Sequence, residues 1–187
     1  MSTKLNAATK FKTNQVKKSK EGNRTISDFW QWAYSDLTQN ITRGVLAEFL
    51  VAWSLGLDGK ARDPWQSYDL KTVKGKTVEV KSAADAQAWA YGNHPPKFIV
   101  KPTRGYDRQK GYGKDRKFQA DIYVLAHLMG QDINKVNPID TNHWRFWVLT
   151  KEELISLLGD RQSISVSMLQ KAKESLSFSG LRKINEI

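Results

Sequence analysis

In the N-terminal part of the chain, apolar residues at helical spacing predict two helices. The first is marked by five such residues, namely Phe29, Trp30, Ala33, Tyr34 and Leu37. Ser27 or Asp28 can cap its N-terminus, because a short polar side chain accepts a hydrogen bond from the first free backbone amides. The second helix is predicted over residues 42–55 and ends at Gly56.

Further along the chain, alternating apolar and polar residues predict a set of short strands. They are expected at residues 68–72, 77–82, 98–101, 120–128 and 144–149. Two helices follow the last strand, over residues 151–158 and about 165–176. This order of elements predicts a mixed α/β or α+β domain that is built on one sheet.

Composition narrows the class of protein. With 187 residues, the chain suffices for one domain with a sizeable core but not for two full ones, and we expect that domain over residues 26–187. No apolar stretch approaches the roughly 18 residues of a membrane span. The absence of cysteine excludes disulfides, thiolate zinc sites and cysteine nucleophiles, and it fits a reducing compartment.

The net charge of +11 favours a polyanionic partner, most simply nucleic acid, over charge that only maintains solubility. Residues 1–25 are basic with few large apolar groups, which predicts a flexible arm. A second basic stretch, residues 71–117, is interrupted by glycine and proline, as in loops or hairpins. Unless they belong only to a solvated loop, we expect DNA phosphates to be contacted by Lys97, Lys101, Arg104, Arg108, Lys110, Lys114, Arg116 and Lys117.

Glu48 is the only charged residue in the apolar run from residue 44 to 57. Its neighbours on the helical surface are apolar, so its carboxylate points where apolar side chains point. A buried carboxylate is costly without a partner and tends to protonate. We expect a cation, a hydrogen-bond network or a metal ion to compensate it; the structural alternative is a salt bridge to Arg43 or a distant lysine.

Two of the predicted strands form a hairpin that gathers three more charged residues. Alternation along residues 77–82 places Glu79 and Lys81 together on one face. Asp69, on the partner strand, can reach the same side. Two carboxylates and one ammonium group are therefore expected to converge at this end of the hairpin.

This arrangement suits hydrolysis of a phosphodiester with a divalent metal ion. Asp69 and Glu79 supply hard oxygen ligands for Mg²⁺, to which the carbonyl of Val80 can be added. Glu48 can bind the metal directly or through water, and Lys81 can orient the attacking water or stabilise charge that develops on the phosphate. We expect the carboxylates of Glu48, Asp69 and Glu79 to lie within reach of one metal ion; a Glu48 that faces a remote arginine would contradict that site.

The pattern of an acid, any residue and a lysine is weak by itself, because about two such triplets are expected by chance. Four are present. Only the triplet of Glu79 and Lys81 lies in a good strand and follows an acid on a plausible partner strand; the register that pairs Asp69 with Lys71 lacks such a strand before it. In isolation, Glu79 and Lys81 would form a weak ion pair on a solvated strand face. Their position after Glu48 and Asp69 favours the catalytic interpretation.

In this order the residues resemble the motif of the PD-(D/E)xK nuclease superfamily, which has the restriction-endonuclease-like fold. The matching stretches are Ala47-Glu48, Tyr68-Asp69-Leu70 and Glu79-Val80-Lys81. The resemblance implies a mixed central sheet flanked by helices, metal binding by Glu48, Asp69 and Glu79, and a catalytic role for Lys81. The proline of the family motif is absent, since Tyr68 precedes the aspartate.

A closer resemblance, over residues from about 42 to 180, is to a group of small bacterial proteins described only as restriction-endonuclease-like. The stretches that carry it include Arg43-Gly44, Gln87-Ala88-Trp89 and residues 65–70, 79–83, 120–124 and 144–149. Gln87 together with Tyr91 is similar to a helper motif of recombination nucleases. Gln87 is therefore a further candidate catalytic residue.

We therefore predict an endodeoxyribonuclease that uses Mg²⁺, or Mn²⁺ in its place, to hydrolyse double-stranded DNA as restriction enzymes do. We expect it in the cytoplasm, encoded by a bacterium or phage, with no membrane partner. One site per compact domain makes a homodimer the expected arrangement for cutting both strands. Two alternatives stay open: a nuclease selective for repair or junction structures, and a DNA-binding module on the same fold that uses the charged residues structurally.

Overall fold

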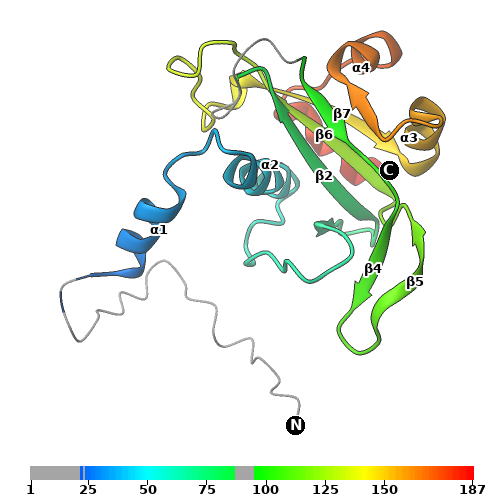
Figure 1. Ribbon diagram of the computed structural model, residues 1–187, viewed down its shortest axis with the longest axis horizontal. Coiled ribbons are helices and arrows are strands. Elements are labelled where there is room, and N and C mark those ends of the chain that lie inside the picture. Colours follow the sequence, from blue (N-terminus) through cyan, green and yellow to red (C-terminus); the bar gives the residue numbers. More distant parts are fainter. Residues whose placement is uncertain (1–21, 23, 87–94) are drawn as a thin grey trace. The chain divides into compact units, whose positions relative to one another are not determined.

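The structure is a computed structural model that describes residues 22, 24–86 and 95–187 (Figure 1). The chain divides into two compact units, residues 1–37 and 38–187, so the boundary follows the first helix, whereas the sequence led us to expect one domain over 26–187. Most of the arm expected over residues 1–25 lies outside the described residues. Within the part of the chain that the structure describes, no helix is long and apolar enough to cross a membrane.

The first unit contains helix α1, Ile26–Tyr34, which confirms the first predicted helix. Its cap is Thr25 rather than Ser27 or Asp28. The Thr25 hydroxyl accepts a hydrogen bond from the N–H of Asp28, and the Asp28 carboxylate accepts one from the N–H of Thr25. This reciprocal pair is a capping box, which satisfies two backbone donors at the start of the helix.

Helix α2, Asn40–Leu55, packs against the central sheet of the second unit, next to the short 3-10 helix η3, Ser179–Glu186. Leu46, Leu50 and Val51 are among its buried residues. The helix ends at Gly56, where φ is 71° and a side chain would be strained. The second predicted helix and its terminal glycine are therefore confirmed.

The central sheet has four strands in the order β1-β2-β6-β7. They are β1 (Leu70–Lys71), β2 (Thr77–Ala84), β6 (Ile122–Leu128) and β7 (Trp144–Thr150). Strand β2 pairs antiparallel with β1 and parallel with β6, and β6 pairs antiparallel with β7. The molecule is thus a mixed α and β protein with a mixed sheet, as predicted. The expectation of one sheet is wrong, because the described residues also form two separate two-stranded sheets. All of β6 is buried, because both faces of the sheet are covered.

The sheet face away from α2 is covered by two helices and a small second sheet (Figure 1). These elements are α3 (Lys151–Leu158), α4 (Val166–Ala172), and β3 (Lys97–Ile99) paired with β8 (Ser163–Ser165); the 3-10 helix η2 (Thr141–His143) leads into β7. Helix α3 confirms the prediction over 151–158. Helix α4 is shorter than the predicted 165–176, because Ser165 caps it and the backbone at Lys173 is extended.

Strands β4 (Thr103–Asp107) and β5 (Gly111–Lys117) form a separate hairpin that extends away from the central sheet (Figure 1). The Asp107 carboxylate closes its turn by accepting hydrogen bonds from the N–H groups of Gln109 and Lys110, each at 2.9 Å. The same backbone donors lower the pKa of Asp107. The basic stretch therefore contains a hairpin, one of the two arrangements that its glycines and prolines predicted.

Candidate active site

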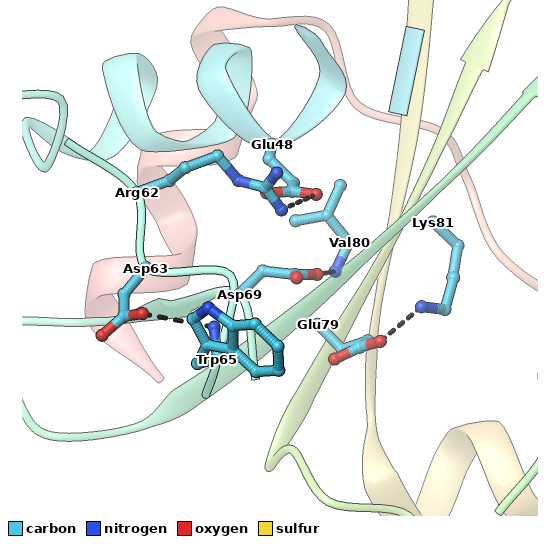
Figure 2. A network of polar contacts seen from close by, with 8 residues as sticks. All are labelled: Glu48, Arg62, Asp63, Trp65, Asp69, Glu79, Val80 and Lys81. Atoms are coloured by element: carbon cyan, nitrogen blue, oxygen red, sulfur yellow. Dashed lines mark hydrogen bonds and ion pairs between the residues drawn. The ribbon is translucent and has the colours of Figure 1, made fainter. Parts of the chain in front are cut away.

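Strand β2 places Glu79 and Lys81 on one face and Val78 and Val80 on the other. Both valines are buried, which fixes the register of the strand. The Glu79 and Lys81 side chains are partly exposed, and the Lys81 ammonium donates a hydrogen bond to the Glu79 carboxylate (Figure 2). The alternation read from the sequence therefore places this pair correctly.

Asp69 lies immediately before β1 and across the hairpin from β2. Its N–H donates to the carbonyl of Val78 at 3.0 Å, and its Oδ2 accepts a hydrogen bond from the N–H of Val80 at 2.7 Å (Figure 2). These two bonds hold the Asp69 carboxylate at the same end of the hairpin as Glu79 and Lys81. The contact made by Val80 uses its N–H, so metal binding by its carbonyl stays a prediction.

Glu48 reaches this region from α2 and is bound by Arg62, whose Nη2 lies 3.0 Å from Oε1 and 2.8 Å from Oε2. Arg43, the arginine that the sequence suggested, donates instead to the carbonyl of Thr38, which precedes α2, and to the side chain of Asn40 at the start of α2. Among the described residues, no three carboxylate or histidine side chains are arranged to hold one metal ion. The expected convergence of Glu48, Asp69 and Glu79 is therefore not met in this conformation, because carboxylates repel one another and Glu48 turns to the guanidinium.

Burial raises the pKa values of all three carboxyl groups, and repulsion from Asp69 adds to the rise for Glu48 and Glu79. Burial raises the pKa of Glu48 to about 7; Asp69 adds to the rise and Arg62 opposes it. Burial is also the main cause of the raised pKa values of Asp69 and Glu79. Burial acts to lower the pKa of Lys81, but Glu79 and the other carboxylates outweigh it and the pKa is raised. The site thus holds more negative charge than its two cations balance.

This excess of negative charge fits a hard divalent cation such as Mg²⁺. Mg²⁺ sites in proteins commonly use one or two carboxylates, with water and substrate phosphate oxygens as the other ligands. Asp69 and Glu79, on one hairpin, are the residues that would hold it. Glu48 faces Arg62 instead, which contradicts the metal site of three carboxylates expected from the sequence, so Glu48 is not counted among these ligands.

A pocket of about 310 Å³ opens beside Glu79 and Lys81. Its polar wall consists of Lys101, Thr103, Gln119 and Tyr123. The Tyr123 hydroxyl accepts a hydrogen bond from the N–H of Ala120 at 3.3 Å, and burial raises its pKa to about 12. Tyr123 therefore stays protonated near neutral pH, and its hydroxyl can donate a hydrogen bond to a sugar or phosphate oxygen in this pocket.

All the residues predicted to contact DNA are exposed and lie in the β3 and β4–β5 region. They are Lys97, Lys101, Arg104, Arg108, Lys110, Lys114, Arg116 and Lys117. Arg108 differs from the rest, because its Nη2 lies 2.7 Å from each carboxylate oxygen of Asp63. Arg108 therefore links the hairpin to the loop before β1. Its guanidinium is paired with an acid, so it is less available to a DNA phosphate than the other basic residues.

Gln87 lies outside the described residues, as do Trp89, Tyr91 and His94. Its predicted catalytic role stays a prediction.

Sequence reasoning missed Arg62 and Tyr123 as neighbours of the site. Arg62 lies in an irregular segment between α2 and β1, where no periodicity indicates which way a side chain points. Tyr123 lies in a strand whose residues are all buried. The pattern of its neighbours therefore gave no sign that its hydroxyl lines a polar pocket. The alternation that placed Glu79 gave no corresponding signal for either residue.

A second polar pocket, of about 500 Å³, lies where β2 and β6 end. There Asp85 accepts a hydrogen bond from the N–H of Gly130 at 2.9 Å and lies 2.7 Å from Nε2 of the buried His127. These contacts tie the end of β2 to the turn after β6. They account for His127 as a structural residue.

No protein-family model matches this chain, and no curated protein matches it at a significant level of similarity. The case for a function therefore depends on the arrangement of Asp69, Glu79 and Lys81.

Proposed function

We propose that this protein is a Mg²⁺-dependent deoxyribonuclease of the restriction-endonuclease-like type, which hydrolyses phosphodiester bonds of double-stranded DNA. The observation that carries the proposal is the grouping of Asp69, Glu79 and Lys81 on one hairpin beside an open pocket. In a chain of net charge +11, a group of partly buried carboxylates at one point suits a metal that faces a polyanion.

The order and direction of the elements support the restriction-endonuclease-like core. A helix that carries Glu48 precedes an antiparallel hairpin that carries the other site residues, and β2 then pairs in parallel with β6. Helices lie on both faces of this mixed sheet (Figure 1). The resemblance seen in the sequence motifs thus agrees with the topology around them.

The side chains divide the work of phosphodiester hydrolysis. Asp69 and Glu79 would hold Mg²⁺, which when bound would supply polarisation of the scissile phosphate and a lower pKa of the attacking water. The Val80 N–H orients the Asp69 carboxylate, and Glu79 keeps Lys81 protonated and near the reacting phosphate. Lys81 then positions the water and stabilises charge that develops on the phosphate oxygens. Lys101 and Tyr123 bind the neighbouring phosphate or sugar from the pocket wall.

The test is cleavage of a randomised duplex library with Mg²⁺, followed by sequencing of the ends. We expect cleavage by the wild type and a loss of at least about a hundredfold in Asp69→Asn, Glu79→Gln and Lys81→Ala. Mg²⁺ should also raise the melting temperature of the wild type but not of Asp69→Asn or Glu79→Gln. Glu152→Gln, which removes an exposed acid from α3, is the matched control and should behave as wild type.

The two alternatives give different results in the same experiment. A DNA-binding module would bind DNA but cut neither duplex, junction nor single-stranded DNA with Mg²⁺ or Mn²⁺; the ion pairs of Glu48 and Glu79 are the observation that favours it. A structure-selective nuclease would cut junctions or tailed DNA in preference to blunt duplex. The homodimer stays a prediction from the need to cut two strands with one site per chain.

A further inference from the structure

Three aromatic rings lie in contact next to the proposed active site. The centroids of Trp65 and Tyr106 are 5.8 Å apart, and those of Tyr106 and Tyr112 are 5.1 Å apart. Trp65 is 58% exposed and Tyr112 is 69% exposed. Large aromatic side chains that are this exposed leave ring surface on which a further ring can stack.

Arginine and lysine side chains lie on the same hairpin as the two tyrosines. In the register of β4 and β5, Tyr106 is opposite Tyr112 and Arg104 is opposite Arg116, with a register shift between these two pairs. Lys114 lies in the shifted stretch of β5 between Tyr112 and Arg116, and its side chain is exposed, as are both arginines. Two arginines directly opposite each other repel, and this repulsion is relieved when an anion binds between them.

The ring cluster is joined to the loop that leads into the active site. A groove of about 540 Å³ runs between residues 63–68 of this loop and residues 106–109 of the hairpin. The Asp63 carboxylate accepts hydrogen bonds from the Arg108 guanidinium and from the N–H of Trp65. These bonds hold the loop and the hairpin together across the groove. Figure 2 shows Trp65 and Asp63 in the same stretch of chain as Arg62 and Asp69. A DNA strand that stacks on Trp65 would therefore be bound by the same loop that leads to Asp69 of the proposed active site.

We propose that the Trp65, Tyr106 and Tyr112 surface binds a single-stranded segment of DNA by stacking on unpaired bases, while Arg104, Lys114 and Arg116 hold its phosphates. Aromatic rings interleaved with cations bind single strands with little sequence preference, because every base has a π-face to stack. In a paired duplex those faces are covered by neighbouring bases. This inference rests on the proposed nuclease function and favours its structure-selective form, whose substrate is duplex DNA with an unpaired strand next to the cut.

The experiment measures binding of the full chain to labelled DNA in EDTA, where no cleavage occurs. The probes are a single strand, a blunt duplex of the same sequence, and that duplex with a single-stranded tail. Trp65→Ala and Tyr112→Ala should each weaken binding of the single strand and the tailed duplex by about tenfold, and of the blunt duplex by less than about twofold. Tyr112→Phe, which keeps the ring, should bind as wild type.

Trp32→Ala, which removes another highly exposed ring, is the matched control and should change none of the three affinities. Tyr112 lies on the hairpin surface, so its substitution separates stacking from any effect of Trp65 on the loop. Equal losses on all three probes, or no loss on tailed DNA, would overturn the stacking surface. Because the assay contains no metal ion, its outcome is independent of whether the wild type cuts DNA with Mg²⁺.

Discussion

Glu48 is the residue whose setting differs most from expectation. It is partly buried at the edge of a cluster of acids, and its ion pair with Arg62 does not balance the cost of its burial, since its pKa rises to about 7. Near neutral pH, a carboxyl group with this pKa can be protonated, can pair with an arginine or can bind a metal ion. Which of these three states predominates depends on the pH and on the cations present.

The raised pKa of Glu48 predicts that stability falls as pH rises. Between the ordinary value of 4.5 and about 7, the unfolded chain has lost the Glu48 proton while the folded chain keeps it. The free energy of unfolding should therefore fall through this range by up to about 3 kcal/mol relative to Glu48→Gln. Urea unfolding in EDTA at about pH 5 and pH 8 measures the difference.

Glu152→Gln provides the control for this comparison, because Glu152 is an exposed acid on α3. Its difference from wild type should stay constant between the two pH values. A Glu48→Gln variant that tracks the wild type at both would show that Glu48 titrates as an exposed acid does.

At the scale of elements, the β4–β5 hairpin has a pair of like charges that does not favour its own stability. The arginines at positions 104 and 116 face each other across the strands, and neither is buried. A hairpin selected for stability would place opposite charges there. The hairpin also contributes nothing to the main core, since it pairs only with itself.

Arg116→Gln should therefore weaken DNA binding without lowering the stability of the fold. Removing one member of the like-charged pair should leave the free energy of unfolding unchanged or raise it by up to about 1 kcal/mol. The slope of log affinity for DNA against log salt concentration should fall in magnitude by about 1, because one phosphate contact is lost. Binding measured over a series of salt concentrations gives the slope.

Arg182→Gln, on η3 and exposed, removes the same charge from a different element. It should leave the salt slope nearly unchanged. A loss of slope as large as that of Arg116→Gln would mean that net charge alone, and not the hairpin, determines DNA affinity.

At the scale of the whole molecule, the charge is distributed unevenly. Residues 1–24 hold seven basic residues and one acidic residue, and another basic group lies on the hairpin of the second unit. The carboxylates of the proposed site lie in that second unit, and Glu79 lines one pocket together with Thr103, the first residue of the hairpin. If the proposed function holds, long-range attraction for DNA and the local chemistry belong to different segments of the chain.

Removal of residues 1–24 should weaken DNA binding without changing the fold of the second unit. The truncated chain loses a net charge of six, so its affinity should become less dependent on salt. Its thermal unfolding should match that of the full chain, since the core consists of residues in the second unit. Unchanged DNA affinity at low salt would contradict a role for this segment in binding.

The sequence by itself determined the elements whose residues repeat with a clear period. Alternation placed Glu79 and Lys81 together on β2, and the apolar run around Glu48 correctly predicted α2 and its end at Gly56. Short-range rules suffice there, because the period of a helix or strand decides which side chains share a face. The mixed class followed from the order of those elements.

Only the tertiary structure decided which residues meet from segments without a period. The pairing of Glu48 with Arg62, and the contact of Trp65 with Tyr106 on a hairpin forty residues further on, depend on the paths of irregular loops. Such contacts follow from packing of the whole chain, since a loop has no repeating geometry from which to read a direction. The sequence therefore suggested a site for metal and phosphate, and the structure showed that Arg62 pairs with Glu48 and that Trp65 contacts Tyr106.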